Sequence, residues 1–318
     1  MSTFVDRFYP SPDGLRLHVR DYAGPADARF TVICIPGLTR NARDFETVAP
    51  HLAARYRVLC VSLRGRGPSD YAKDPMSYQP PTYVRDMMAL FKHFGLKRAA
   101  LVGTSLGGLV SILLGAVMPT KVLGIVLNDI GPDIDPAGLT RIAGFVARGY
   151  AGPSWDAAAD ALQALDGKLF PDYTRDDWLA MARKRFRQAD DGTIHHNYDI
   201  NIAKPFGDAA KAGAAATSLW PFYARLAGIP VLAVRGVMSD VLAPATFAKM
   251  KTVLPHIEQC TVPQRGHTPY LDEPVARAAV DDFLARLPGR LDGLTLARRT
   301  LRQIEFLIRL RLGGVPGA

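Results

Sequence analysis

Short apolar runs alternate with amphipathic stretches along the first 130 residues of the chain. Residues 30–37 (FTVICIPG), 57–65 (RVLCVSLRG), 99–103 (AALVG) and 122–129 (VLGIVLND) are apolar almost without a break. Such runs are typical of strands buried on both faces. The stretches between them have helical spacing, as in TYVRDMMALFKHFGL, which ends at Gly95. Strands that alternate with helices predict an α/β fold, with a mostly parallel sheet covered by helices on both faces.

This alternation is interrupted once. Residues 133–225 contain no strong strand pattern, several helical stretches and many aromatic side chains, and the strand–helix alternation resumes at 230–236 (PVLAVRG). We therefore predict an α/β core formed by residues 1–132 and 226–288, with 133–225 as a helical cap. Residues 289–318 are expected to form a basic amphipathic helix or tail.

Composition excludes several classes of protein. The 318 residues are 48% hydrophobic and 22% charged, which is ordinary for a globular chain with a large core. No apolar run reaches the roughly 18 residues that span a bilayer, and the N-terminus lacks the pattern of a secretory signal. Cys34, Cys60 and Cys260 lie in apolar runs. They are expected to be buried free thiols in the cytoplasm, and no metal site is predicted.

The net charge of +9 is concentrated near the C-terminus, where residues 286–312 carry seven arginines and two carboxylates. No nucleic-acid-binding motif accompanies this charge, so no nucleic-acid partner is expected. In the tail, apolar residues recur at helical spacing with arginines on other faces. They are Leu294, Leu301, Ile304, Ile308 and Leu312. Docking on the body or contact with a second copy is preferred over weak binding to an anionic membrane surface.

The segment GTSLG at residues 103–107 matches the pattern G-x-S-x-G between a predicted strand and a predicted helix. In that context the pattern forms a nucleophile elbow, with Ser105 held on a strained turn above the sheet. Side chains at 103 or 107 would collide with the neighbouring strand or helix. A plain glycine-rich turn is the alternative, whereas a phosphate-binding loop would need a lysine that is absent here.

A nucleophilic serine needs a base, and His267 follows the last predicted strand, on the same sheet edge as Ser105. A third group must orient the imidazole. Asp240, which follows the strand at 230–236, and Asp129, which ends the strand at 122–129, both emerge at this edge. Asp240 is preferred, because an acid one strand before the histidine is the usual order.

A developing oxyanion needs N–H donors. The backbone N–H of Leu106, directly after the serine, is expected to be one of them. The second is expected from Leu38, in the turn after the first apolar run, with Gly37 allowing close approach of the backbone and of substrate. Substrate contacts in the cap are predicted from its aromatic side chains, because such a cap suggests an apolar pocket under a lid. The candidates are Trp155, Tyr198, Trp220 and Tyr223.

Over residues 15–287 the chain resembles the α/β-hydrolase fold superfamily. The motifs that carry the resemblance are GTSLGG, SLRGRGPSDYAKDP with Ser62 where the family has aspartate, NDIGP, RGVMSD and GHTPYLDEP. Together they resemble a bacterial esterase- and lactonase-like branch, with a low-level likeness to 3-oxoadipate enol-lactonase and proline iminopeptidase relatives.

The resemblance implies a helical cap over the site and no cofactor. A serine at 105, where dehalogenases and epoxide hydrolases of this fold have aspartate, implies an acyl-enzyme formed from a small-molecule ester or lactone. Hydrolysis of a C–C bond, aminopeptidase or perhydrolase activity, and a non-catalytic receptor remain alternatives.

Overall fold

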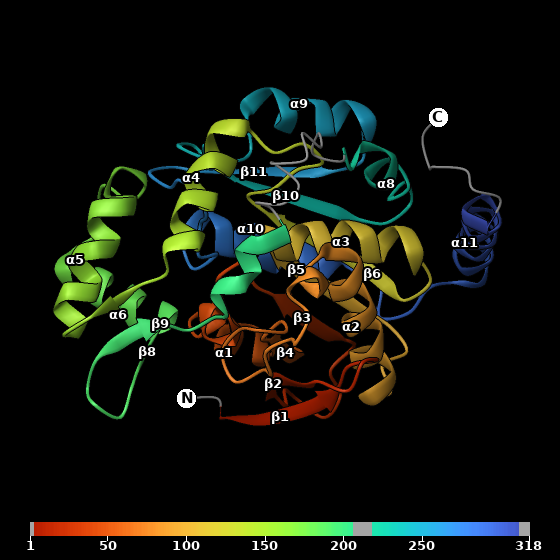
Figure 1. The fold of residues 1–318 in the computed structure, drawn as a ribbon. Coiled ribbons are helices and arrows are strands. Elements are labelled where there is room, and N and C mark those ends of the chain that lie inside the picture. Colours follow the sequence, from red (N-terminus) through yellow and green to blue (C-terminus); the bar gives the residue numbers. More distant parts are fainter. Residues whose placement is uncertain (1–2, 206–217, 312–318) are drawn as a thin grey trace.

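The computed structural model describes residues 3–205 and 218–311, and its centre is an eight-stranded sheet (Figure 1). The order is β1-β2-β4-β3-β5-β6-β10-β11, and all neighbours from β4 to β11 are parallel. The strands are β1 (Phe4–Pro10), β2 (Arg16–Tyr22), β3 (Thr31–Ile35), β4 (Arg57–Val61), β5 (Ala99–Thr104), β6 (Val122–Asn128), β10 (Val231–Gly236) and β11 (Glu258–Val262). The predicted mostly parallel α/β sheet is confirmed.

The antiparallel hairpin β1–β2 at one edge was not predicted. β1 is largely exposed and β2 carries charged residues between apolar ones, so neither gives a continuous apolar run. β2 pairs with β4 in the antiparallel sense, which adds the hairpin to the parallel sheet.

Helices cover both faces of the sheet, because alternate strand residues point to opposite sides. Ile33 and Ile35 of β3 face one layer, and Val32 and Cys34 face the other. The first layer contains α2 (Pro80–His93), α3 (Leu106–Val117), α8 (Trp220–Ala224) and α9 (Pro244–Val253). The second contains α1 (Val48–Ala53) and α10 (Pro274–Arg286). Both faces are therefore buried, as the unbroken apolar runs predict.

The three cysteines are free and buried, as expected. Cys34 and Cys60 are paired neighbours on β3 and β4, inside the layer that α1 and α10 cover. Burial raises the pKa of the Cys60 thiol well above its usual value, with the Cys34 thiol as the next cause. Both residues therefore serve as small core side chains.

The segment after β6 contains α4 (Pro136–Arg148), then α5 (Trp155–Asp166) and α6 (Arg175–Arg185), which lie at one end of the molecule, and later α8, which lies towards the other end (Figure 1). It also contains a small antiparallel sheet in the order β7-β9-β8, formed by β7 (Ala151–Gly152), β8 (Phe186–Gln188) and β9 (Ile194–His196). These strands were not predicted, since two or three residues are too few to produce a recognisable period. Four short 3-10 helices complete the described elements: η1 (Ala42–Phe45), η2 (Pro75–Ser77), η3 (Gly167–Leu169) and η4 (Ile200–Ala203).

This cap has its own apolar cluster, built around Trp178 and Phe170 and joined by Tyr270 from the segment after β11. Its helices begin at sequence-coded caps. Ser154 accepts from the N–H of Ala157 at the start of α5, and Thr174 forms a capping box at the start of α6. Residues 206–217 of the predicted cap lie outside the described residues.

The C-terminal helix α11 (Gly293–Arg311) lies at the opposite end of the molecule from α5 and α6 (Figure 1). It docks on the body through Arg299, whose buried guanidinium donates to the carbonyls of Pro119, Val122 and Gly228 at 2.6–3.0 Å. Phe306 is buried on the same face.

The apolar residues that predicted this helix do not form its docking face. Leu294, Leu301, Ile304 and Ile308 are all exposed, and Leu312 lies outside the described residues. Within residues 3–205 and 218–311, no helix is both long and apolar enough to cross a bilayer.

Candidate active site

Ser105 lies on a strained turn between β5 and α3. Its backbone has φ 52° and ψ −117°, outside the conformations that non-glycine residues prefer. A Cβ at Gly107 would lie 2.0 Å from the carbonyl oxygen of Ile35, and one at Gly103 would lie 2.4 Å from that of Gly107. The two glycines are thus required by close backbone approach, and the predicted elbow geometry is present.

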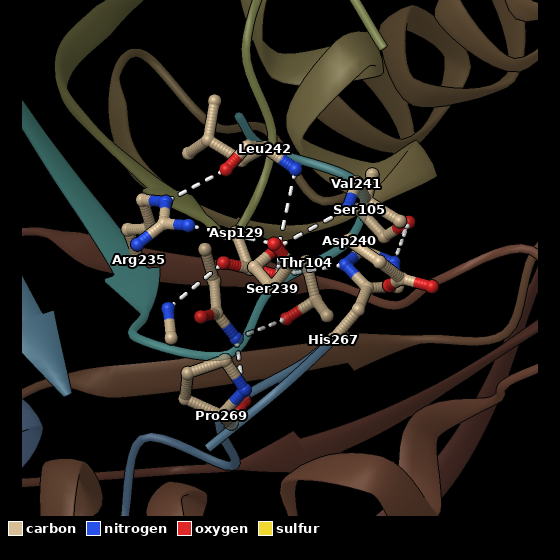
Figure 2. A network of polar contacts seen from close by, with 12 residues as sticks. Thr104, Ser105, Asp129, Arg235, Ser239, Asp240, Val241, Leu242, His267 and Pro269 are labelled. Carbon is tan, nitrogen blue, oxygen red and sulfur yellow. Dashed lines mark hydrogen bonds and ion pairs between the residues drawn. The ribbon is translucent and has the colours of Figure 1, made fainter. Parts of the chain in front are cut away.

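The imidazole of His267 lies between two oxygen atoms (Figure 2). Its Nε2 is 2.9 Å from Ser105 Oγ, and its Nδ1 is 2.8 Å from Oδ2 of Asp129. His267 follows β11 and Ser105 follows β5, so the carboxyl edge of the parallel sheet brings them together as predicted. The structure therefore contains a serine–histidine–aspartate chain of hydrogen bonds whose acid is Asp129.

Asp129 is completely buried at the end of β6 and is held in one orientation. Its backbone N–H donates to the carbonyl of Val234 at 2.8 Å. Its Oδ1 accepts from the N–H of Gly236 at 2.9 Å, and its Oδ2 accepts from the Ser239 hydroxyl at 2.7 Å as well as facing His267. These donors hold Oδ2 towards the imidazole, where it accepts the Nδ1–H of His267.

The prediction that Asp240 orients His267 is wrong. The Asp240 carboxylate instead forms a bidentate ion pair with Arg141 of α4, with contacts of 2.6 Å to Nε and 2.9 Å to Nη2. Burial alone would raise the pKa of Asp240, but the hydrogen bonds and charge of Arg141 outweigh burial and hold that pKa below its usual value. Asp240 thus connects the core to the cap.

Asn128, the residue before Asp129 in the sequence, connects three segments of the site through its side-chain amide. Its Nδ2 donates to the carbonyl of Pro269 at 2.7 Å and lies 3.2 Å from the hydroxyl of Thr104. Thr104 precedes the serine and Pro269 follows the histidine by two residues, so one buried amide fixes both loops relative to β6.

The turn after β3 approaches the serine. A Cβ built on Gly37 would lie 3.6 Å from Cβ of Ser105. The turn is fixed by Arg66, a fully buried residue whose Nε donates to the carbonyl of Leu38 at 2.8 Å. Among the described residues, the backbone N–H groups of Leu38 and Leu106 have no hydrogen-bond partner. Their predicted role as oxyanion donors stays a prediction, and Arg66 is a positioning residue that sequence reasoning missed.

A cavity of about 70 Å³ opens onto Ser105 and His267. Gly37 lines it, and the predicted contact of Gly37 with substrate stays a prediction. The lining contains apolar side chains, which we call the apolar wall, and charged side chains, which we call the charged wall. The apolar wall contains Leu38, Ile142, Phe145, Val146 and Leu165. The charged wall contains Arg40, Arg141, Asp166 and Arg185.

The four aromatic residues predicted to contact substrate are placed elsewhere. Tyr198 and Tyr223 are buried in the core, with hydroxyls directed to the carbonyls of Val146 and Met250. The indole N–H of Trp220 donates to Asp133, and Trp155 packs on the cap cluster below Arg183. They contribute to packing, because a large aromatic ring stabilises the fold by burying its apolar area.

The cavity wall instead comes from α4 and from the ends of α5 and α6. Nothing in their sequences separates Arg141 and Arg185 from the other arginines of the cap. Both are brought to the site by the packing of cap on core, which a sequence pattern does not encode. The sequence pattern also gave no role to Ser239, although this residue directly precedes Asp240 in RGVMSD.

The fold and this chain of hydrogen bonds define the class of protein. Residues 31–274 match the family described as the alpha/beta hydrolase fold, and the chain belongs to that family. It is a hydrolase, and the matched region includes all three members of the hydrogen-bond chain.

The chain is also similar to individual proteins of known name or structure. The chain is 34% identical to a 3-hydroxybutyrate-oligomer hydrolase of Cupriavidus necator, over 86% of this chain and 94% of that protein. It is 29% identical to a 2-(acetamidomethylene)succinate hydrolase of Mesorhizobium japonicum, over 74% and 80% of the two chains. A crystal structure of an alpha/beta hydrolase from Novosphingobium aromaticivorans superposes with a TM-score of 0.84 at 46% identity, covering 90% of this chain and all of that one.

Proposed function

We propose that the protein hydrolyses carboxylic esters through an acyl-enzyme, with Ser105 as nucleophile, His267 as general base and acid, and Asp129 as the acid of the triad. The observation that carries the proposal is the continuous chain from Ser105 Oγ through His267 to Asp129, with contacts of 2.9 and 2.8 Å. These distances are within the range that proton transfer requires.

In the first half of the reaction, Ser105 Oγ attacks the ester carbonyl carbon while His267 Nε2 takes the hydroxyl proton. The buried Asp129 accepts the Nδ1–H bond and stabilises the imidazolium. The N–H groups of Leu38 and Leu106 receive the oxyanion of the tetrahedral intermediate. Collapse of this intermediate breaks the ester C–O bond, and His267 gives its proton to the leaving alkoxide.

In the second half, water attacks the acyl carbon of the Ser105 ester. His267 takes one proton of that water and then returns a proton to Ser105 Oγ as the serine leaves. The carboxylic acid is released and the free enzyme is regenerated. No further co-reactant is needed to balance the reaction.

The substrate we propose is an ester of a short aliphatic acid. Support comes from the small cavity with one apolar wall and from the likeness to a hydrolase of 3-hydroxybutyrate oligomers, whose units are joined by ester bonds. Lactones contain the same acyl–oxygen bond and follow the same steps. The free volume of about 70 Å³ is smaller than ordinary ligand pockets, so α4 and the other cap elements must shift to admit substrate.

The test combines turnover with covalent labelling. Purified protein is expected to hydrolyse p-nitrophenyl acetate and butyrate, and to react with a fluorophosphonate at Ser105, identified by peptide mass spectrometry. Ser105→Ala should lose both properties, whereas the exposed Ser218→Ala control should keep both. Absence of turnover together with absence of label would remove the enzyme proposal and favour a receptor of the same fold. Turnover that persists in Ser105→Ala would remove the acyl-enzyme.

A further inference from the structure

Arg185, the last residue of α6, is a buried cation in the wall of the active-site cavity. Only 7% of its surface is exposed, and its Nη1 donates to Asp166 at 2.8 Å. Its Nε and Nη2 have no solvent exposure and no hydrogen-bond partner within the described part of the chain. Unpaired buried donors on a charged group are costly, so this edge of the guanidinium requires an explanation.

Three other arginines of the same molecule show what this edge is used for. Arg57 holds Asp21 through Nε and Nη2, with contacts of 3.0 and 2.7 Å. Arg64 holds Asp86 through the same two atoms, with both contacts at 2.7 Å.

Arg141, which shares the cavity with Arg185, uses this edge for Asp240 at 2.6 and 2.9 Å. The planar fork matches the two oxygens of a carboxylate. Arg185 presents the same fork without a carboxylate on it.

The neighbouring charges leave this fork unfilled. Asp166, the carboxylate bonded to Arg185, is shared with Arg141, whose Nη1 lies 3.4 Å from its other oxygen. The remaining carboxylate at this end of the cavity, Asp240, is occupied by Arg141. Within residues 3–205 and 218–311, no carboxylate is bonded to Nε or Nη2 of Arg185, so this fork is open to an acid from outside the chain.

We propose that Arg185 is the specificity residue for a substrate that carries a free carboxylate in addition to its ester bond. Ser105, His267 and Arg185 line one small cavity, so the carboxylate belongs within a few bonds of the scissile ester. The apolar wall formed by Ile142 and Phe145 then contacts the short aliphatic segment between the two groups. This inference rests on the proposed ester hydrolysis for its kinetic readout, but its binding readout is independent.

The kinetic test uses pairs of substrates that differ only in terminal charge. One pair is 3-acetoxybutanoate and 3-acetoxybutanamide, with the charge on the alcohol side of the ester. The other is monoethyl succinate and ethyl succinamate, with the charge on the acyl side. We expect kcat/KM of the native protein to favour the acid over the amide by about tenfold or more in one pair, as a charge-assisted two-point contact supports.

The decisive variant is Arg185→Lys, which keeps a positive charge for Asp166 but lacks the planar fork. Its acid-to-amide ratio of kcat/KM should fall at least tenfold. The matched control is Arg183→Lys on the same helix, where the side chain is exposed and packs on Trp155. That variant should keep the native ratio. Thermal unfolding of both variants checks that they are folded.

Binding is measured separately by calorimetry on Ser105→Ala, which cannot turn over substrate. The acid should bind and the amide should bind at least tenfold more weakly, and Arg185→Lys in the same background should abolish this difference. Native protein that hydrolyses both members of each pair equally would overturn the inference while leaving ester hydrolysis intact. An acid preference unchanged in Arg185→Lys would equally overturn it. No hydrolysis of any ester, together with acid-selective binding that depends on Arg185, would overturn the proposed reaction and support the carboxylate site.

Discussion

Replacing Asp129 by asparagine tests the triad most directly, because the structure determines how the new amide must sit. The N–H of Gly236 donates to Oδ1 at 2.9 Å, so the amide oxygen is held on that side. The amide NH₂ then takes the place of Oδ2, 2.8 Å from Nδ1 of His267. It donates to Nδ1, which forces the imidazole proton onto Nε2.

In that tautomer Nε2–H faces Ser105 Oγ and cannot accept the serine proton. The Ser239 hydroxyl, which donates to Oδ2 at 2.7 Å in the native protein, would also have to turn. Wrong-tautomer substitutions of this kind lower kcat by about 10⁴, or roughly 5 kcal/mol of transition-state stabilisation. We expect Asp129→Asn to lose about 10³- to 10⁴-fold in kcat while remaining folded.

The assay is hydrolysis of p-nitrophenyl butyrate under saturation, with circular dichroism and thermal unfolding to confirm the fold. Asp240→Asn is the matched control, since it removes a carboxylate from the same sheet edge without touching His267. A folded Asp129→Asn enzyme within tenfold of native kcat would refute the reasoning. So would a loss of 10³ or more that occurs in Asp240→Asn alone.

Three further predictions concern stability. Gly107→Ala should destabilise the fold by about 3 kcal/mol or more in urea unfolding, because the added Cβ would lie 2.0 Å from the carbonyl oxygen of Ile35 in β3. The control Gly144→Ala, with open space around the added Cβ, should be neutral or stabilising by up to about 1 kcal/mol. Arg299→Met should cost about 2–4 kcal/mol because three buried carbonyls lose their donor, whereas the exposed Arg298→Met should change unfolding little; equal effects would contradict the docking account of α11. The hydrogen bonds and charge of Arg64 lower the pKa of Asp13. The stabilisation that this ion pair gives to the fold is therefore present above the ordinary carboxyl pKa of about 4, and it is lost as the pH falls below that value. Between pH 5 and pH 3, the urea midpoint of Asp13→Asn should therefore fall less than that of the native protein, and parallel decreases would exclude this pair as a source of acid sensitivity.

Local sequence was sufficient for the parallel strands and for the elbow. A strand buried on both faces must be apolar throughout, so β3, β5 and β6 can be predicted from their composition. Gly103 and Gly107 are likewise required by short-range geometry. The hairpin β1–β2 could not be predicted, because a strand at a sheet edge is exposed on one side. Its alternation of apolar and polar residues is short and is interrupted by charged residues.

The cavity wall could not be predicted in this way. The aromatic character of Trp155 and Tyr223 suggests an apolar pocket, but each side chain packs within its own apolar cluster instead. Arg141 and Arg185 reach the site because α4 and α6 pack at the edge of the cavity. This packing depends on contacts between segments far apart in the sequence, such as the hydrogen bond from the N–H of Gly266 to the carbonyl of Leu169.

Asp129 and Asp240 differ as possible partners of His267 because of the loop after β10. Both follow parallel strands at the same edge, so the order of strands did not separate them. In the loop after β10, adjacent residues point in opposite directions: the Ser239 hydroxyl donates to Asp129, and the Asp240 carboxylate faces Arg141 of the cap. A hydroxyl therefore stands beside the acid of the triad, and the carboxylate next to it in sequence holds the cap.

Because the two carboxylates have different partners, replacing Asp240 and replacing Asp129 should change different kinetic parameters. Loss of the Asp240 charge leaves the tautomer of His267 unchanged but releases one end of Arg141, and with it the position of α4 over the cavity. We therefore expect Asp240→Asn to raise KM several-fold while kcat changes less than threefold, the reverse of the pattern for Asp129→Asn. Steady-state kinetics on a single ester measures both parameters. A fall in kcat with KM unchanged would mean that Asp240 acts on the chemical step itself, through its charge near His267, and that its bond to Arg141 does not position the cap.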